Sequence, residues 1–199
     1  MVLGRLAALI LIFVVGVSLN LSWQKARDEN RNLLKKFCSR SAGLFAIAAL
    51  ISFATWIYPN NGWIFWGIIH FIAFSVFACH FFAKYFKLNL VLGIASILLG
   101  FYLQNYSNSN IFLFIVGIPA NFYTLDYFPI FPWIGVVFLG MFFSKAVYIK
   151  KVFGKMDFIF WKIPCLKIFE AAGRNSLLIY LLHQPLLVGA IFLLKLFFG

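Results

Sequence analysis

Long apolar runs are the feature that most constrains this chain. A membrane-spanning helix needs about 20 consecutive apolar residues, and six stretches approach or reach that length. Of the 199 residues, 64% are hydrophobic and 11% charged, whereas soluble domains usually carry about 25% charged residues. We therefore expect an all-α, polytopic transmembrane helix bundle of about six spans, formed by residues 1–199 as a single domain. The expected spans are residues 2–22, 41–58, 63–83, 89–104, 130–148 and 175–198.

The basic residues predict the orientation of these spans. Fifteen of the 17 Lys and Arg residues fall in the stretches 23–40, 84–88 and 145–174, and the alternate loops 59–62 and 105–129 contain none. Short cytoplasmic loops carry the Lys/Arg excess, so we expect both termini outside, in a multi-pass protein of the cytoplasmic membrane. The net charge of +12 is then explained by the basic residues of the cytoplasmic loops. The expected partners are therefore membrane lipids and not nucleic acid.

One further apolar stretch, residues 111–125, is expected not to cross the membrane. A full span there would move the seven basic residues of 145–174 to the outer side, against the charge rule. Gly117 and Pro119 would also end any helix in it. We expect a re-entrant or interfacial segment on the outer face, near an interfacial belt of aromatic residues that includes Trp66.

Two histidines lie inside expected spans. His70 lies about 10 Å from the outer end of its span, and His183 about 12 Å from the inner end of the last one. In a hydrocarbon core of about 30 Å these depths are similar, so the two could share a mid-membrane cavity. Polar residues at such depths either form part of a functional site or hydrogen-bond neighbouring helices to each other. For His70 the favoured interpretation is a hydrogen bond to a neighbouring helix. His80, beside Lys84 at the membrane edge, is expected to be non-catalytic.

The last expected span contains an unusual turn. It begins after Gly173-Arg174-Asn175-Ser176, where Asn or Ser is a good helix cap. Pro185 removes one backbone hydrogen bond and leaves the carbonyl of Leu181 without its partner. His183, Gln184 and this carbonyl then share one kinked turn, which is equally consistent with a functional site and with a purely architectural kink.

Asp126 is the only acidic residue on the expected outer side. The favoured interpretation is a turn residue that caps the span beginning near residue 130. The alternative is a carboxylate that pairs with a buried histidine or with a substrate. Only Arg5 and Lys195 are basic on that side, and this scarcity of charge partners is the reason for favouring the turn residue.

Several chemistries have no signature here. The three cysteines, Cys38, Cys79 and Cys165, contain no C-x-x-C pair, so neither a zinc site nor a disulfide framework is indicated. The sequence has no P-loop, no G-x-G-x-x-G after a strand and no G-x-S-x-G. We expect no metal site.

Four segments, in chain order, resemble prokaryotic membrane proteins that share the catalytic domain of heparan-α-glucosaminide N-acetyltransferase, within the wider transmembrane acyltransferases. The first two are common patterns in membranes, and the last two are more specific. The segments are Phe13-Val14-Val15-Gly16-Val17-Ser18-Leu19, Gly67-Ile68-Ile69-His70-Phe71-Ile72-Ala73, Asp126-Tyr127-Phe128-Pro129-Ile130-Phe131-Pro132-Trp133-Ile134-Gly135 and Gly173-Arg174-Asn175-Ser176-Leu177-Leu178-Ile179-Tyr180-Leu181-Leu182-His183-Gln184-Pro185-Leu186-Leu187.

This resemblance implies transfer of an acetyl group from cytosolic acetyl-CoA to a small-molecule or glycan acceptor across the membrane. A mid-membrane histidine would act as general base or acetyl carrier, and basic loops would hold the CoA phosphates. It implies acetyl-CoA as co-substrate, with no permanently bound cofactor, and it is compatible with a homo-oligomer. The catalytic candidates are His183, His70 and Asp126, and the CoA-binding candidates are Lys150, Lys151, Arg174 and Asn175.

The start of the chain departs from the family pattern. Family members usually begin with an additional helix that has an Arg-rich start and carries the histidine usually held responsible for acetyl transfer. The resemblance aligns this chain from the second helix onward, which implies a misassigned start or a truncated, inactive member. Two rival functions therefore remain: a transporter or lipid-binding bundle that uses the histidines as relays, and a structural subunit without catalysis.

Overall fold

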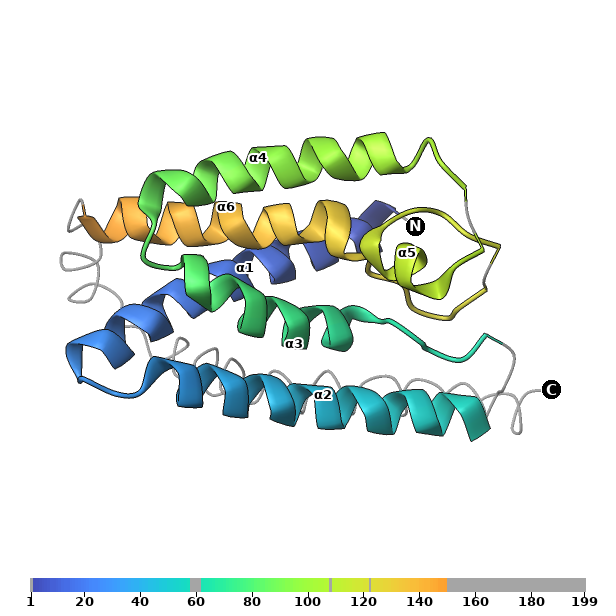
Figure 1. Ribbon diagram of the computed structural model, residues 1–199, viewed down its shortest axis with the longest axis horizontal. Coiled ribbons are helices and arrows are strands. Elements are labelled where there is room, and N and C mark those ends of the chain that lie inside the picture. The colour runs from blue at the N-terminus through green and yellow to red at the C-terminus, as the bar shows by residue number, and fades with distance from the viewer. Residues whose placement is uncertain (1, 58–61, 108, 122, 150–199) are drawn as a thin grey trace, which may run out of the picture. The chain divides into compact units, whose positions relative to one another are not determined.

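The computed structural model describes residues 2–57, 62–107, 109–121 and 123–149 (Figure 1), all within one compact unit, Met1–Lys150. Within this part the structure is helical, with isolated β-bridges such as Trp66 to Tyr127 and no strand. The expected span 175–198 lies outside the described residues. The helices are α1 (Val2–Asp28), α2 (Leu33–Ile57), α3 (Ile68–Cys79), α4 (Phe86–Leu103), α5 (Ile111–Val116) and α6 (Ile130–Ile149), with a 3-10 turn, η1 (His80–Phe82), after α3.

The ends of the first helices differ from the expected ends. α1 continues to Asp28 and α2 already begins at Leu33, because Lys and Arg are good helix formers and nothing in their side chains stops a helix at the membrane surface. α3 begins only at Ile68, since the preceding residues pair with another loop. By length and composition, Gly4–Asp28, Leu33–Ile57 and Phe86–Leu103 can each cross a membrane, and Ile68–Phe82 and Ile130–Ala146 are shorter apolar helices.

The long helices alternate in direction (Figure 1). Ser41 of α2 bonds to the carbonyl of Ala73, and Ser52 to that of Ile64, so α2 and α3 are antiparallel. α4 is likewise antiparallel to α6, because Phe86 stacks on Phe142 while Gly100 lies against Pro132.

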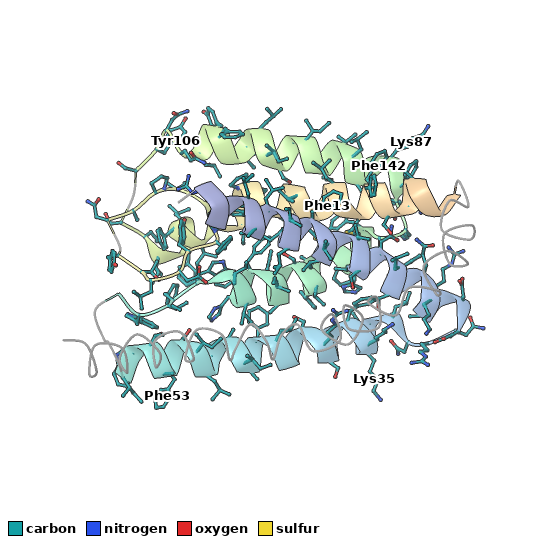
Figure 2. The ribbon with its side chains drawn as sticks, turned by 180° about the vertical axis from the view of Figure 1, so that it is seen from behind. Phe13, Lys35, Phe53, Lys87, Tyr106 and Phe142 are labelled. Atoms are coloured by element: carbon teal, nitrogen blue, oxygen red, sulfur yellow. The ribbon has the colours of Figure 1, made fainter. Side chains whose placement is uncertain are left out.

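As a result, the basic stretches of the described helices gather at one end, which we call the basic end. Figure 2 shows Lys35 and Lys87 at this end and Phe53 and Tyr106 at the opposite one. Lys145 reaches across to donate to the carbonyl of Lys84 at 2.8 Å. The described helices therefore have the alternation that the charge rule requires, and the assignment of this end to the cytoplasm remains a prediction.

Glycines allow α1 and α6 to approach closely. A Cβ atom at Gly16 would lie 2.2 Å from the carbonyl oxygen of Val137, and one at Gly140 would lie 2.3 Å from that of Phe13. Beside this contact, the fully buried amide of Asn20 donates to the carbonyl of Met141 at 2.7 Å. Small residues at contacts and side-chain amides between helices are how helices associate in lipid, where apolar surface alone gives no advantage.

The segment 111–125 does not span the bundle. α5 has six residues, about 9 Å at 1.5 Å per residue, and it lies between the end of α4 and the start of α6 at the same end of the bundle. The side chain of Asn110 accepts a hydrogen bond from the backbone N–H of Phe112, and Gly117, at φ 130°, ends the helix. This short helix fits the expectation that the segment is re-entrant or interfacial and not a full span.

Candidate functional site

Two loops meet at the end of the bundle opposite the basic end, and together we call them the cap: residues 62–67, before α3, and 123–128, before α6. They run side by side in the same direction, with a parallel β-bridge between them. The pairing brings residues about 60 positions apart in the chain into contact. Three hydrogen bonds join the loops, from Leu125 N to Gly62 O at 2.7 Å, from Phe128 N to Trp66 O at 3.3 Å, and from Thr124 Oγ1 to Trp63 O at 3.0 Å.

Asp126 lies at the N-terminus of α3. Its Oδ2 atom accepts a hydrogen bond from the backbone N–H of Ile68 at 2.9 Å, where a carboxylate also meets the positive end of the helix dipole. Gly67 makes room for it, because a Cβ there would lie 2.4 Å from Oδ2. The expectation that Asp126 caps the helix beginning near residue 130 was wrong: the pairing of the cap loops turns its carboxylate toward α3.

The environment of Asp126 changes its acidity. Burial raises the pKa of this carboxyl, and the backbone N–H groups of Ile68 and Tyr127 counteract part of the rise by hydrogen bonding to the charged form. Burial also raises the pKa of the Tyr127 phenol to about 12, so this hydroxyl stays protonated and donates to the carbonyl of Phe114. Of these two groups, Asp126 is therefore the one whose ionisation can affect stability near neutral pH.

Asp126→Asn should alter how stability depends on pH. A pKa raised in the folded state means that the folded protein binds the proton more tightly, so the wild type loses stability as pH rises above the ordinary carboxyl value of 3.8 and through the folded pKa. The amide oxygen of the variant can still accept from the N–H of Ile68, but the side chain cannot ionise. The variant should therefore not show the fall in stability with rising pH. The measurement is the thermal midpoint in detergent from about pH 4 to pH 8. Asp28→Asn, at an exposed carboxyl, is the control, and equal pH profiles for wild type and Asp126→Asn would contradict the prediction.

His70 lies on the first turn of α3, and both of its ring nitrogens have partners. Nδ1 accepts from the backbone N–H of Gly67 at 3.4 Å, and Nε2 lies 3.3 Å from Oγ of Ser52 on α2. The favoured expectation, a histidine hydrogen-bonded across helices, fits this geometry. His70 and Asp126 each accept a backbone N–H at the start of α3, but in the described part of the chain no hydrogen bond or ion pair joins them.

Trp66 is the cap residue that the sequence did not single out. Its ring lies 5.7 Å from that of His70, centroid to centroid, and its indole Nε1 is buried without a hydrogen-bond partner among the described residues. A buried N–H without a partner costs free energy, about 1–3 kcal/mol. The sequence shows Trp66 as one of several interfacial tryptophans. Its pairing with the loop before α6 is what sets Trp66 apart from the others.

The other predicted site residues lie outside the described part of the chain: His183, Lys150, Lys151, Arg174 and Asn175. The cavity shared by His70 and His183 and the CoA-phosphate site therefore remain predictions. Within the described ranges, no group of three His, Cys, Asp or Glu side chains is placed to hold a metal ion.

Apolar helices long enough to cross a membrane, packed through glycines and buried amides, define a helical membrane protein. The family model described as heparan-alpha-glucosaminide N-acetyltransferase, catalytic, matches residues 1–185. The chain belongs to this family, as the resemblance of its four segments implied. No curated protein and no solved structure matches the chain.

Proposed function

We propose that this protein is an integral-membrane acyltransferase of the cytoplasmic membrane that moves an acetyl group from acetyl-CoA to an amine or hydroxyl acceptor on the opposite side. The observation that supports this most strongly is the family match, which extends over residues 1–185 and so includes the cap, His70 and His183. The family is described by an N-acetyltransferase activity, which makes a small-molecule or glycan amine the first acceptor to test.

The reaction breaks the thioester C–S bond and forms a C–N or C–O bond to the acetyl carbon. The leaving sulfur ends as the thiol of CoA, and the acceptor gives up one proton. In the proposal His183 either takes this proton as general base or first accepts the acetyl group on its imidazole and then passes it on. The kinked turn ahead of Pro185 would give that side chain access from the bundle interior.

The cap is the proposed acceptor site. Asp126 uses Oδ2 for the N–H of Ile68, yet a carboxylate oxygen has two lone pairs and can accept again, from an amine or a hydroxyl of the acceptor. The indole N–H of Trp66 has no partner in the part of the chain that the structure describes and can donate to an oxygen of the acceptor substrate, while its ring offers an apolar face to a sugar. Trp66 and Asp126 lie on the two paired loops of the cap, and recognition of a polar molecule requires a donor and an acceptor of this kind in a partly buried site.

The cytoplasmic side of the membrane is the proposed donor side. Lys150, Lys151, Arg174 and Asn175 would hold the phosphates of acetyl-CoA through charge-assisted hydrogen bonds. Because this attraction is screened by salt, we expect the KM for acetyl-CoA to rise with ionic strength. Lys150→Ala/Lys151→Ala should raise KM roughly tenfold, which corresponds to about 1.4 kcal/mol. Lys195→Ala, on the predicted outer side, serves as control. A KM for acetyl-CoA that changes neither with salt nor with the double substitution would refute this CoA-phosphate site.

The test of the function is release of CoA thiol from acetyl-CoA by the purified chain in liposomes, with an amino sugar as acceptor inside or outside. We expect release that depends on protein, followed by an acetylated acceptor in the compartment opposite to acetyl-CoA. Folded protein that moves a solute down its gradient without releasing CoA would identify a transporter instead. Folded protein without either activity would overturn the proposal.

A further inference from the structure

The hydrogen bonds around His70 define where its ring proton lies. The Gly67 backbone N–H can only donate, so Nδ1, its acceptor at 3.4 Å, carries no proton. A neutral imidazole then has its proton on Nε2, which lies 3.3 Å from Ser52 Oγ. The Ser52 hydroxyl donates its own hydrogen to the carbonyl of Ile64 at 2.6 Å, so its oxygen lone pairs are free to accept from Nε2–H. The three bonds form one consistent chain from Gly67 to Ile64.

This chain of bonds holds the loop 62–67 against α2. Ile64 is fixed at both of its backbone groups, because Ser52 donates to its carbonyl and its N–H donates to Oγ1 of Thr55 at 3.1 Å. His70 adds a bond from α3 to the same hydroxyl of Ser52 and a bond to Gly67, the residue immediately before α3. One loop is thus fastened to α2 at Ile64 and to α3 at Gly67.

The loop 62–67 in turn binds the second loop of the cap, residues 123–128. Leu125 and Phe128 donate to the carbonyls of Gly62 and Trp66. The position of residues 123–128 therefore depends on the position of residues 62–67. Asp126 is bound to Ile68, one residue after Gly67. His70 therefore bonds at Gly67 to the loop that carries Trp66 and that holds the loop of Asp126, without bonding to Asp126 itself.

We propose that His70 is a positioning residue: as the neutral imidazole with its proton on Nε2, it clamps the loop 62–67 between α2 and α3 and so places Asp126 and Trp66. The assignment of these two residues to an acceptor site rests on the proposed function, whereas the clamp itself does not. A general base needs a nitrogen lone pair free to take a proton, and here the only such lone pair, on Nδ1, is already bonded to Gly67.

The first test is independent of activity. In protein with ¹⁵N-labelled histidine and tryptophan in detergent micelles, the His70 signals, identified by their loss in His70→Gln, should show a protonated Nε2 and an unprotonated Nδ1 at neutral pH. Ser52→Ala should shift the Nε2 signal and the indole signal of Trp66. Ser41→Ala removes a different hydroxyl bond between the same two helices and should leave both signals in place. A proton on Nδ1, a charged ring, or equal effects of the two serine variants would overturn the proposal.

The second test separates positioning from base catalysis in the working enzyme. His70→Asn keeps an acceptor near the position of Nδ1, and His70→Gln keeps a donor near that of Nε2, so each variant retains one half of the clamp. We expect the acceptor KM to rise more than kcat falls, with His70→Ala worse than either. Loss of a general base would instead cost about 10²–10⁴ in kcat in all three, which would overturn the assignment. If the wild type transfers no acetyl group while the ¹⁵N signals are as expected, the proposed function fails and the clamp stands.

Discussion

His183→Ala is expected to lower CoA release by about 10²–10⁴-fold, the range that one positioned general base contributes. Alanine removes the only atoms of this side chain that can take a proton or carry an acetyl group, and it leaves the helix-forming backbone intact. Release is measured as free thiol in liposomes at saturating acetyl-CoA. The yield of monodisperse protein and its melting midpoint serve as controls for folding.

Two additions make the His183 result specific. Free imidazole in the assay should restore part of the activity of the alanine variant if the missing group is the imidazole itself. A burst of about one CoA per protein without acceptor would identify the acetyl-carrier route, since covalent catalysis leaves an acyl-enzyme that accumulates. Unchanged turnover in His183→Ala would remove this residue from the mechanism.

Gly140→Leu is expected to prevent α1 and α6 from packing. A Cβ at residue 140 would lie 2.3 Å from the carbonyl oxygen of Phe13, and a backbone atom cannot move aside as the end of a flexible side chain can. Overpacking a well-packed core typically costs about 1–3 kcal/mol, and a clash with backbone on a long interface should reach or exceed the upper value. The measurements are the folded fraction on size exclusion and the thermal midpoint in detergent.

Gly43→Leu is the matched control for this prediction. Gly43 is also a helical glycine, on α2, but a Cβ there meets nothing within 4 Å. The substitution should be neutral or slightly stabilising, because glycine is less favourable than leucine in a helix by about 0.8 kcal/mol. Equal melting of the two leucine variants would show that the close approach of α1 and α6 does not support the fold.

The apolar runs predicted the helices well and their ends poorly. Hydropathy reports where a chain prefers lipid, and it identified five of the helices that the structure describes. It does not report where a helix stops in water, so α1 and α2 extend into the basic stretch through Lys25 and Lys36. The expected start of the third span at residue 63 was wrong for another reason. The carbonyls of Trp63 and Trp66 bond to a loop about 60 residues away instead of forming a helical turn.

The candidate site divides in the same way. Asp126 and His70 could be selected from sequence because polar groups are costly near the membrane interior. Trp66 could not, since nothing local separates it from the other interfacial tryptophans. The role of Asp126 was misread because its hydrogen-bond partner, Ile68, lies 58 positions away, beyond any capping pattern that a sequence contains.

The sequence by itself predicted a membrane protein, five of the described helices with their alternating directions, and the family, because apolar length, charge alternation and short motifs are local properties of the chain. Tertiary structure alone decided that Asp126 caps α3, that His70 bonds Gly67 and Ser52, and that Trp66 joins them. These depend on which loops pair at the end of the bundle. That pairing is decided by hydrogen bonds between distant residues, together with the close approach of helices that glycines permit.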